Sequence, residues 1–392
     1  MLAALALIAA CDHVPQNAVE ACQAEVHVLP ARTDILLVID DSISMTEEQE
    51  NLRANLEAFV SALADAAVPH DFQVGVTTTD VMGYDGRDHY RVEPPYDAYS
   101  WLVPYPRGTL VAVNPAALTD AGKIGDFIYD PAHGFGGPRI LAAGQANLLE
   151  DFQANVLLGP HGASKEQPFH AAELALSEAL TQGANAGFLR PGARLGVIIL
   201  TDEDDCSEAA PPFLANDNDQ CHDDAIKAQL PAPTDFLALL DAPIAGEQRD
   251  PVVAVIAGFD QDTLQPTGCP TSYDEPTRLA SLLDAMGPGR SFRGSICDSD
   301  FGPSLQRIAD LLVPQTVPLD GAPSDPSMLV ASVHKTDGSV VPCPVALEGK
   351  DTAQTGAVYT PPRSGRTATL TFDHACRLVS GDRVDIRLIC AG

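Results

Sequence analysis

The stretch Asp34–Met45, "DILLVIDDSISM", decides how this chain is interpreted. Its aliphatic run from Ile35 to Ile39 is typical of a strand that is buried on both faces of a parallel sheet. An ordinary turn of Gly, Pro or Asn does not follow it. Two aspartates and two serines follow instead, and among them Asp40, Ser42 and Ser44 place oxygen ligands at a spacing that suits a cation. The stretch therefore predicts a strand that ends in a metal site.

Three further segments are predicted strands of the same buried type. They are "FQVGVTTTD" (72–80), "RLGVIILTDEDDCS" (194–207) and "PVVAVIAGF" (251–259). Amphipathic helices are predicted between them, at 46–66, 162–183, 276–287 and 301–312, and "GRSFRGSIC" (289–297) is predicted as an edge strand. This alternation predicts an α/β fold with a doubly wound, mainly parallel sheet.

The residue pattern changes after Pro314, where the sequence predicts short strands of alternating polarity without helices. We therefore expect a small C-terminal β appendage. The predicted organisation is a signal segment at 1–11, a tether at 12–31, the α/β domain at 32–316 and the β domain at 317–392. The first helix is expected to begin with a capping box of Thr46 and Gln49, and its buried face comprises Leu52, Leu56, Phe59, Val60 and Leu63.

The composition is that of a globular protein with a strongly acidic surface. Of 392 residues, 45% are hydrophobic, and 54 acidic residues against 23 basic ones give a net charge of −31. Such a surface repels phosphate backbones and anionic lipid headgroups, so nucleic acid is excluded as a partner. It favours cations and basic partners.

The N-terminus reads "MLAALALIAACD", an apolar segment placed like a signal-peptide core and too short to span a bilayer. Its "LIAAC" resembles the bacterial lipobox, in which Cys11 is lipidated and becomes the mature N-terminus. A buried N-terminal helix is the alternative. No other segment has about 18 consecutive apolar residues, so no transmembrane helix is expected. The chain is thus predicted to be an extracytoplasmic membrane lipoprotein of bacterial type.

Nine cysteines fit an oxidising compartment, because eight remain for disulfides once Cys11 is set apart. No CxxC or clustered Cys/His spacing supports the zinc alternative. The predicted pairs are Cys206–Cys221, Cys269–Cys297, Cys376–Cys390 and Cys22–Cys343.

In doubly wound sheets, ligands bind beyond the carboxyl ends of the strands. "DDSIS" at 40–44 resembles the D-x-S-x-S motif of von Willebrand factor A domains, whose metal-ion-dependent adhesion site holds a divalent cation. "VIILTDEDD" at 197–205 is similar to that family's later strand, which ends in T-D. The resemblance extends over 32–313. It implies that Asp40 and Asp202 are acidic ligands, one of them often through water, and that Ser42 and Ser44 coordinate directly.

The family's remaining ligand is a Thr in the loop before the middle helix, and this chain has "GASKEQP" there. Ser164 or Glu166 is the candidate replacement, although Ser164 with Gln167 also fits an ordinary capping box. A glutamate ligand would make the ion less electrophilic. Thr79 and Asp80 end the neighbouring strand and either line the same crevice or serve as turn residues. The acidic run at 203–224 lacks EF-hand spacing, which favours a solvated, disulfide-pinned loop over a second Ca²⁺ site.

Hard oxygen donors indicate Mg²⁺ first, with Mn²⁺ or Ca²⁺ as alternatives. GxSxG, HExxH, GxxxxGK[ST] and a strand-following GxGxxG are all missing from the sequence. The favoured function is a non-enzymatic, lipid-anchored adhesion protein that captures an acidic side chain of a protein partner through its metal. The alternative is a metal-dependent hydrolase of phosphates or esters, which the lack of a basic residue near the site disfavours.

Overall fold

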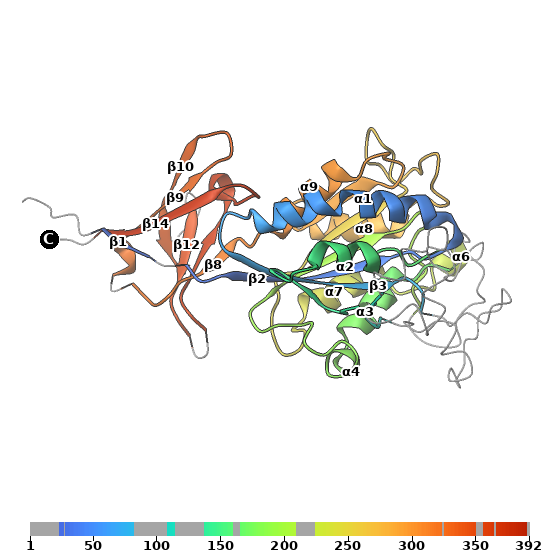
Figure 1. Ribbon diagram of the computed structural model, residues 1–392, viewed down its shortest axis with the longest axis horizontal. Coiled ribbons are helices and arrows are strands. Elements are labelled where there is room, and N and C mark those ends of the chain that lie inside the picture. The colour runs from blue at the N-terminus through green and yellow to red at the C-terminus, as the bar shows by residue number, and fades with distance from the viewer. Residues whose placement is uncertain are drawn as a thin grey trace, which may run out of the picture.

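A computed structural model describes residues 23–26, 28–81, 108–113, 137–159, 165–208, 224–323, 325–349, 356–363 and 366–389. An α/β domain and a smaller β domain lie end to end along the long axis (Figure 1). The predicted signal segment, Cys11 and most of the predicted tether fall outside the described residues.

The α/β domain is built on a sheet in the order β4-β3-β2-β5-β6-β7. The strands are β2 (Ala31–Ile39), β3 (His70–Thr78), β4 (Leu141–Ala142), β5 (Arg194–Leu200), β6 (Val252–Ala257) and β7 (Ser291–Ser295). All pair in parallel except β4, which pairs with β3 in the antiparallel sense. The strand predicted from "ILLVI" is central, with Leu37 opposite Val76 on one side and Ile198 on the other. The predicted fold class is confirmed.

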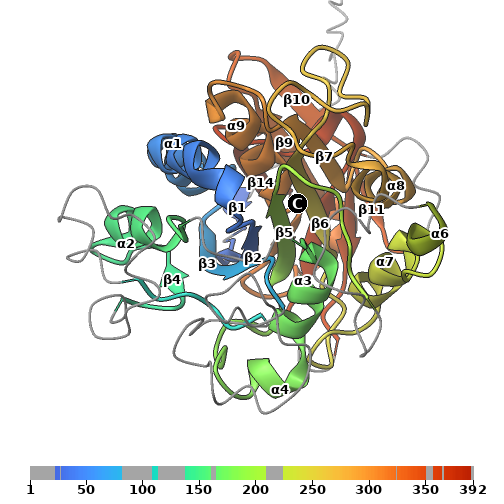
Figure 2. The same ribbon diagram turned by 90° about the vertical axis from the view of Figure 1, so that its right-hand side faces the viewer.

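Alternate residues of the central strand face two separate cores. Ile35, Leu37 and Ile39 belong to one core, while Leu36 and Val38 belong to the other. Helices α1 (Thr46–Ala64), α2 (Leu148–Asn155) and α9 (Gly302–Leu312) cover the first face. Helices α3 (Pro168–Leu176), α7 (Pro233–Asp241) and α8 (Thr277–Met286) cover the second (Figure 2). A strand buried on both sides needs the unbroken aliphatic run that the sequence shows.

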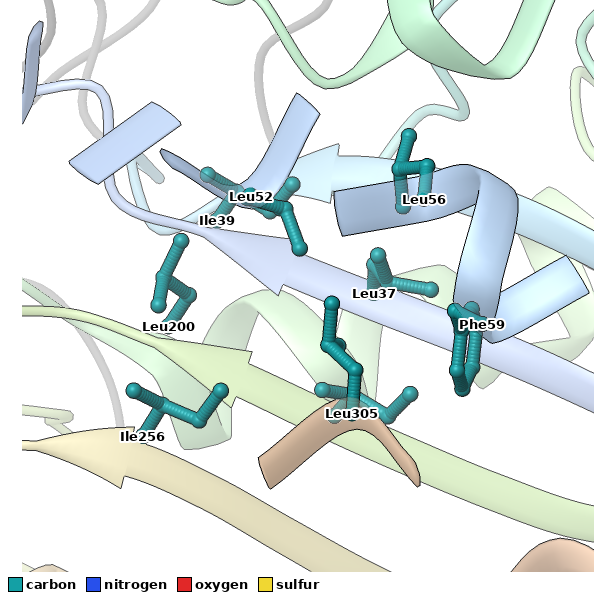
Figure 3. A pocket seen from close by; sticks show the side chains of 9 residues that line it. Leu37, Ile39, Leu52, Leu56, Phe59, Leu200, Ile256 and Leu305 are labelled. Carbon is teal, nitrogen blue, oxygen red and sulfur yellow. The ribbon is translucent and has the colours of Figure 1, made fainter. Parts of the chain in front are cut away.

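The first core retains a small apolar cavity between the sheet and helices α1 and α9. Figure 3 shows Leu37 and Ile39 of β2 on its sheet side, with Leu56 and Phe59 of α1 and Leu305 of α9 across from them. Every one of these side chains is at most 2% exposed. The predicted buried face of α1 is confirmed at four positions, and Val60 is only partly buried.

Two predicted capping boxes are wrong, although the first predicted helix does start at Thr46. Helix α1 follows a short 3₁₀ turn, η1 (Ile43–Met45), and its N-cap is Met45, so Thr46 and Gln49 form no capping box. Helix α3 begins at Pro168, which places its N-cap at Gln167 and rules out Gln167 as the third residue of a box opened by Ser164. The predicted helix 162–183 is also divided, because Ser177 ends α3 and caps α4 (Glu178–Thr181). A further short helix, α6 (Asp224–Lys227), precedes α7.

The β domain consists of two small sheets. One has the order β1-β14-β9-β10, formed by Gln23–Glu25, Arg383–Ile389, Leu329–His334 and Val340–Cys343. The other has the order β11-β12-β13-β8, formed by Val345–Leu347, Ala357–Thr360, Thr369–Phe372 and Thr316–Pro318. Two 3₁₀ turns, η4 (Pro326–Met328) and η5 (His374–Cys376), complete it. The segment predicted as a tether thus supplies strand β1, because Gln23–Glu25 pair with the last strand.

The β domain packs against the end of the large sheet where the parallel strands begin. Its core includes Ala31 at the start of β2, Val68 just before β3, and Val313 after α9. The Ser380 hydroxyl donates to the carbonyl of Ala62 (2.6 Å) at the end of α1. The carboxyl ends of the strands therefore lie at the pole of the molecule remote from the β domain (Figure 1).

The disulfides confirm one predicted pair and correct two. Cys269 is bonded to Cys297, as predicted. Cys343 is bonded to Cys376, so Cys376–Cys390 and Cys22–Cys343 are wrong: β10 ends at Cys343 beside η5, which brings the two Cα atoms to 5.9 Å. Cys206 is disulfide-bonded, while Cys221, its predicted partner, lies outside the described residues, as do Cys22 and Cys390.

None of the helices in the described ranges combines the length and the apolar character that a membrane span requires.

Candidate metal centre

Asp40 lies at the junction of the two central strands. Its amide donates to the carbonyl of Leu200 (2.9 Å), which continues the pairing of β2 with β5 by one residue. Its carboxylate accepts a hydrogen bond at each oxygen, from the Ser42 amide at Oδ1 (2.8 Å) and from the Thr201 hydroxyl at Oδ2 (2.7 Å). The side chain is fully buried and held in one orientation.

Ser42 contacts Asp40, and Ser44 approaches Asp202. The Ser42 and Ser44 hydroxyl oxygens are 3.1 Å apart, and the Ser44 side chain lies near enough to the Asp202 carboxylate to favour its charged form. The structure thus brings together all four residues that the resemblance implies as ligands. Asp202 is 2% exposed, and its Oδ1 has no hydrogen-bond partner within the described part of the chain.

Electrostatics at this cluster favours a cation. Burial raises the pKa of Asp40 to about 6. Burial, together with the charge of Asp40, raises the pKa of Asp202 to about 7. Two neighbouring carboxylates out of water lose their hydration and repel one another. A positive charge between them offsets both the lost hydration and the repulsion.

Glu166 joins the same cluster from the loop before α3. The Thr79 hydroxyl at the end of β3 donates to one of its carboxylate oxygens, and the other oxygen is buried without a partner among the described residues. Burial and the charge of Asp40 raise the pKa of Glu166 well above its ordinary value. Ser164, the other loop candidate, lies outside the described residues. Asp80 at the end of β3 is buried close to Asp41.

Gln49 is a site residue that the sequence interpretation missed. Its amide nitrogen donates to the Asp40 carbonyl (2.9 Å), and its amide oxygen accepts from the Gly159 amide (2.9 Å). The side chain is 1% exposed, so this polar group is buried only because both ends are bonded. Its sequence signal, a Gln near a helix start, is identical to that of a capping box.

The acidic run after β5 divides into two roles. Asp202 and Glu203 face the candidate centre, and burial followed by the charge of Asp40 raises the pKa of Glu203 well above its ordinary value. Asp204 instead accepts from the backbone amides of Arg278 (3.0 Å) and Leu279 (3.2 Å) at the start of α8. Asp205 accepts from the Phe169 amide (3.2 Å) near the start of α3 and pairs with the Arg278 guanidinium (2.9 Å). Residues 209–223 of the predicted acidic loop lie outside the described ranges.

The donors present fit a divalent cation with few protein carboxylates. Within the described residues, no three His, Cys, Asp or Glu side chains converge as the ligands of an assembled metal site. The set implied here needs only Asp40 and Asp202 as acidic ligands, since the hydroxyls of Ser42 and Ser44 and water supply neutral oxygens. The unpartnered Asp202 oxygen is the observation that fits a cation ligand at this point.

No family model matches the chain, and no curated protein matches it. Among solved structures, it is similar to a von Willebrand factor type A protein from Catenulispora acidiphila, with 14% identity, a TM-score of 0.35, and coverage of 95% of this chain and 63% of that one. It is also similar to the pilus adhesin SpaC from Lactobacillus rhamnosus GG, in its open conformation, with 9% identity, a TM-score of 0.35, and coverage of 93% and 40%. A third is the human COPII-coat protein Sec24c, with 11% identity, a TM-score of 0.35, and coverage of 92% and 39%.

The chain thus spans less than two thirds of the length of each of these structures. At such identities and TM-scores the likenesses carry no argument about function. The architecture rests on the strand order and on the two-sided burial of β2. By that architecture the chain has the doubly wound fold that its resemblance to von Willebrand factor A domains implies.

Proposed function

We propose that this protein is an extracytoplasmic binding protein that captures an acidic group of a protein partner through a divalent cation. Asp40, Ser42, Ser44 and Asp202 would hold the ion. One observation carries the proposal: four side chains that follow two adjacent strands lie close together, and a buried Asp202 oxygen among them finds no partner within the described residues.

The neutral hydroxyls give this donor set its chemistry. Two carboxylates neutralise a divalent ion, and serine oxygens add no further negative charge, so a coordination position left to water remains available to a partner's carboxylate. Glu166 lies close enough to Asp40 for their charges to interact, and it is the candidate for the loop position. Mg²⁺ is the ion we favour, with Mn²⁺ and Ca²⁺ as alternatives.

Ile43 supports a protein partner over a free ion or a small acid. It lies between the two ligand serines, yet its side chain is 83% exposed. An apolar side chain at the rim of a charged site can pack against the surface of a protein partner. A small free carboxylate offers no such surface.

The overall shape is consistent with attachment through the N-terminus. Strand β1, which begins at Gln23, lies in the β domain, whereas β2 and β5 carry Asp40 and Asp202 beyond their carboxyl ends, which lie away from the β domain (Figure 1). We propose that lipidation of Cys11 anchors the chain and that the β domain holds the metal centre away from the membrane. Detergent partitioning of the wild type and of Cys11→Ala tests this, and a mature protein that begins at Met1 in mass spectrometry would contradict it.

Calorimetric titration with Mg²⁺ and Mn²⁺ tests the metal centre itself. We expect Asp40→Ala to abolish binding and Ser42→Ala, Ser44→Ala and Asp202→Ala to weaken it, with circular dichroism unchanged. Asp284→Ala is the matched control, because this α8 carboxylate is 74% exposed and pairs only with Arg293 among the described contacts. Equal divalent affinity in the wild type and Asp40→Ala would place the ion elsewhere.

The partner is tested by a pulldown from surface extracts with metal, with EDTA, and with metal restored. Capture that disappears in EDTA and returns with Mg²⁺ in the wild type, but not in Asp40→Ala, supports the proposal. Capture that persists in EDTA would remove the cation from the mechanism.

A further inference from the structure

The loop Thr267–Glu275, between β6 and α8, contacts the candidate metal centre through the backbone of Asp202. The Asp202 carbonyl accepts hydrogen bonds from the amides of Tyr273 (2.9 Å) and Asp274 (3.1 Å). A carbonyl held by two donors fixes the peptide plane that follows Asp202. It therefore also fixes the direction in which the Asp202 carboxylate leaves the backbone.

A disulfide attaches this loop to the edge of the sheet. Cys269 in the loop is bonded to Cys297, which follows edge strand β7. Inside the loop, the Cys269 carbonyl accepts from the Ser272 amide (3.0 Å) and the Ser272 hydroxyl (2.9 Å). A short bonded path thus runs from the bridge to Ser272 and on to Tyr273, the first donor to Asp202.

Gly258 adds a second restraint on the same loop. A Cβ at this position, just after β6, would lie 2.5 Å from the Asp274 carbonyl oxygen and 2.7 Å from the Ser272 Cβ. Only glycine allows the loop to approach the strand end this closely. The two restraints act on Ser272 and Asp274, on either side of Tyr273.

We propose that the Cys269–Cys297 bridge is a positioning device for the metal ligand Asp202, so that metal affinity depends on the redox state of this bridge. The inference rests on the proposed metal centre. With the bridge closed, Tyr273 and Asp274 hold the Asp202 carbonyl; with it open, the loop is released and Asp202 loses its fixed direction. Groups that orient a metal ligand typically contribute about 10-fold or more to affinity.

The coupling is reciprocal, because linkage between two equilibria acts in both directions. A bound cation that prefers the ordered loop must slow reduction of this bridge. With dithiothreitol as reductant, Cys269 and Cys297 gain two electrons and two protons, and the reagent is oxidised to its cyclic disulfide. The Cys343–Cys376 bridge, in the β domain at the opposite pole, serves as an internal control.

The main test compares two perturbations of the loop with one control. The Cys269→Ser/Cys297→Ser variant opens the bridge, Gly258→Ala pushes the loop away with the bridge intact, and Cys343→Ser/Cys376→Ser opens the remote bridge. We expect the first two to bind Mn²⁺ about 10-fold more weakly. We also expect faster hydrogen exchange at the Tyr273 and Asp274 amides, and no change at the Leu279 amide, which Asp204 holds. The control variant should match the wild type in each respect.

Hydrogen exchange separates the failure of this inference from failure of the metal centre. Unchanged Mn²⁺ affinity despite faster exchange at Tyr273 and Asp274 would overturn the positioning role and leave the metal centre standing. Unchanged exchange would overturn it too, because the bridge would not hold the loop. Absence of Mn²⁺ binding in the wild type would refute the metal centre and, with it, this role. Reduction of Cys269–Cys297 that Mn²⁺ slows, while Cys343–Cys376 reacts at an unchanged rate, supports the proposal; equal rates with and without Mn²⁺ contradict it.

Discussion

The Thr201 hydroxyl donates a 2.7 Å hydrogen bond to Asp40 Oδ2 and so joins residues 161 positions apart in the sequence. Both residues directly follow central strands, β2 and β5, whose parallel pairing extends to Ile39 and Leu200. The same hydroxyl accepts from the Glu203 amide (3.1 Å), which shapes the turn that carries Asp202. Thr201 therefore orients Asp40, a candidate ligand, directly and Asp202, the other acidic candidate, through the backbone.

Thr201→Val should weaken divalent binding. The substitution keeps the shape of the side chain but removes the donor to Asp40 and the acceptor for Glu203, so we expect roughly 10-fold lower Mn²⁺ affinity in calorimetry. Thr201→Ser keeps the hydroxyl and should stay near the wild type. A loss of affinity in Thr201→Ser as large as that in Thr201→Val would show that the hydroxyl hydrogen bonds do not account for the effect.

Gln49→Leu should destabilise the fold itself. The variant leaves the Asp40 carbonyl and the Gly159 amide buried without their partner, which costs about 1–3 kcal/mol in the free energy of unfolding. Urea denaturation measures this cost. Gln306→Leu on the exposed side of α9 is the control and should change stability by no more than about 0.5 kcal/mol. A similar loss in both variants would mean that the hydrogen bonds of Gln49 to Asp40 and Gly159 have no special role in stability.

Glu166→Gln should lower divalent affinity, because it removes a carboxylate close to Asp40 while keeping an acceptor for the Thr79 hydroxyl. We expect a loss of about 10-fold if Glu166 fills the loop position. Calorimetry at fixed pH, with Glu173→Gln on α3 as a control, provides the comparison. An affinity equal to that of the wild type would return the loop position to Ser164 or to water.

His70 should make stability depend on pH. Its Nδ1 is 3.0 Å from the Leu63 carbonyl and its Nε2 is 2.8 Å from the Thr33 hydroxyl, an arrangement that suits the neutral ring. Burial, with Arg190 and Arg194 nearby, lowers its pKa to about 4 against the opposing effects of the Leu63 carbonyl and of Asp71. The unfolded chain therefore binds the proton more readily between pH 6.5 and 4, so stability is complete above pH 6.5 and falls as the pH drops.

This pH effect is isolated by comparing the wild type with His70→Gln in urea. The stability of the wild type relative to the variant should fall by about 2–3 kcal/mol between pH 8 and pH 4.5. A constant difference across this range would show that His70 titrates normally in the folded protein.

Non-reducing peptide mapping should recover Cys269 linked to Cys297 and Cys343 linked to Cys376. Removal of the second bridge by a double Ser substitution should cost about 2–4 kcal/mol. A peptide that joins Cys376 to Cys390 would restore the pairing expected from proximity in sequence.

The sequence by itself determined the sheet and indicated four residues of the candidate site. An aliphatic run without alternation is stable only between two apolar layers, so the "ILLVI" segment had to be a central strand. Because parallel strands end at one edge, the oxygen-bearing residues that follow them had to meet there. Asp40 with Ser42 and Ser44, and Asp202 after the later strand, meet in this way in the structure.

Only the tertiary structure decided which polar groups of identical local signal serve the site. Gln49 fits a capping box in sequence, yet it clamps Asp40 because the helix starts after a 3₁₀ turn. Asp202 and Asp204 belong to one acidic run. Asp204, however, accepts hydrogen bonds from the amides at the start of a helix more than 70 residues further along the chain. Cys343 and Cys376 become partners because β10 and η5 pack side by side. Each outcome depends on which groups distant in sequence lie close enough in space to bond, and residue spacing along the chain does not encode that distance.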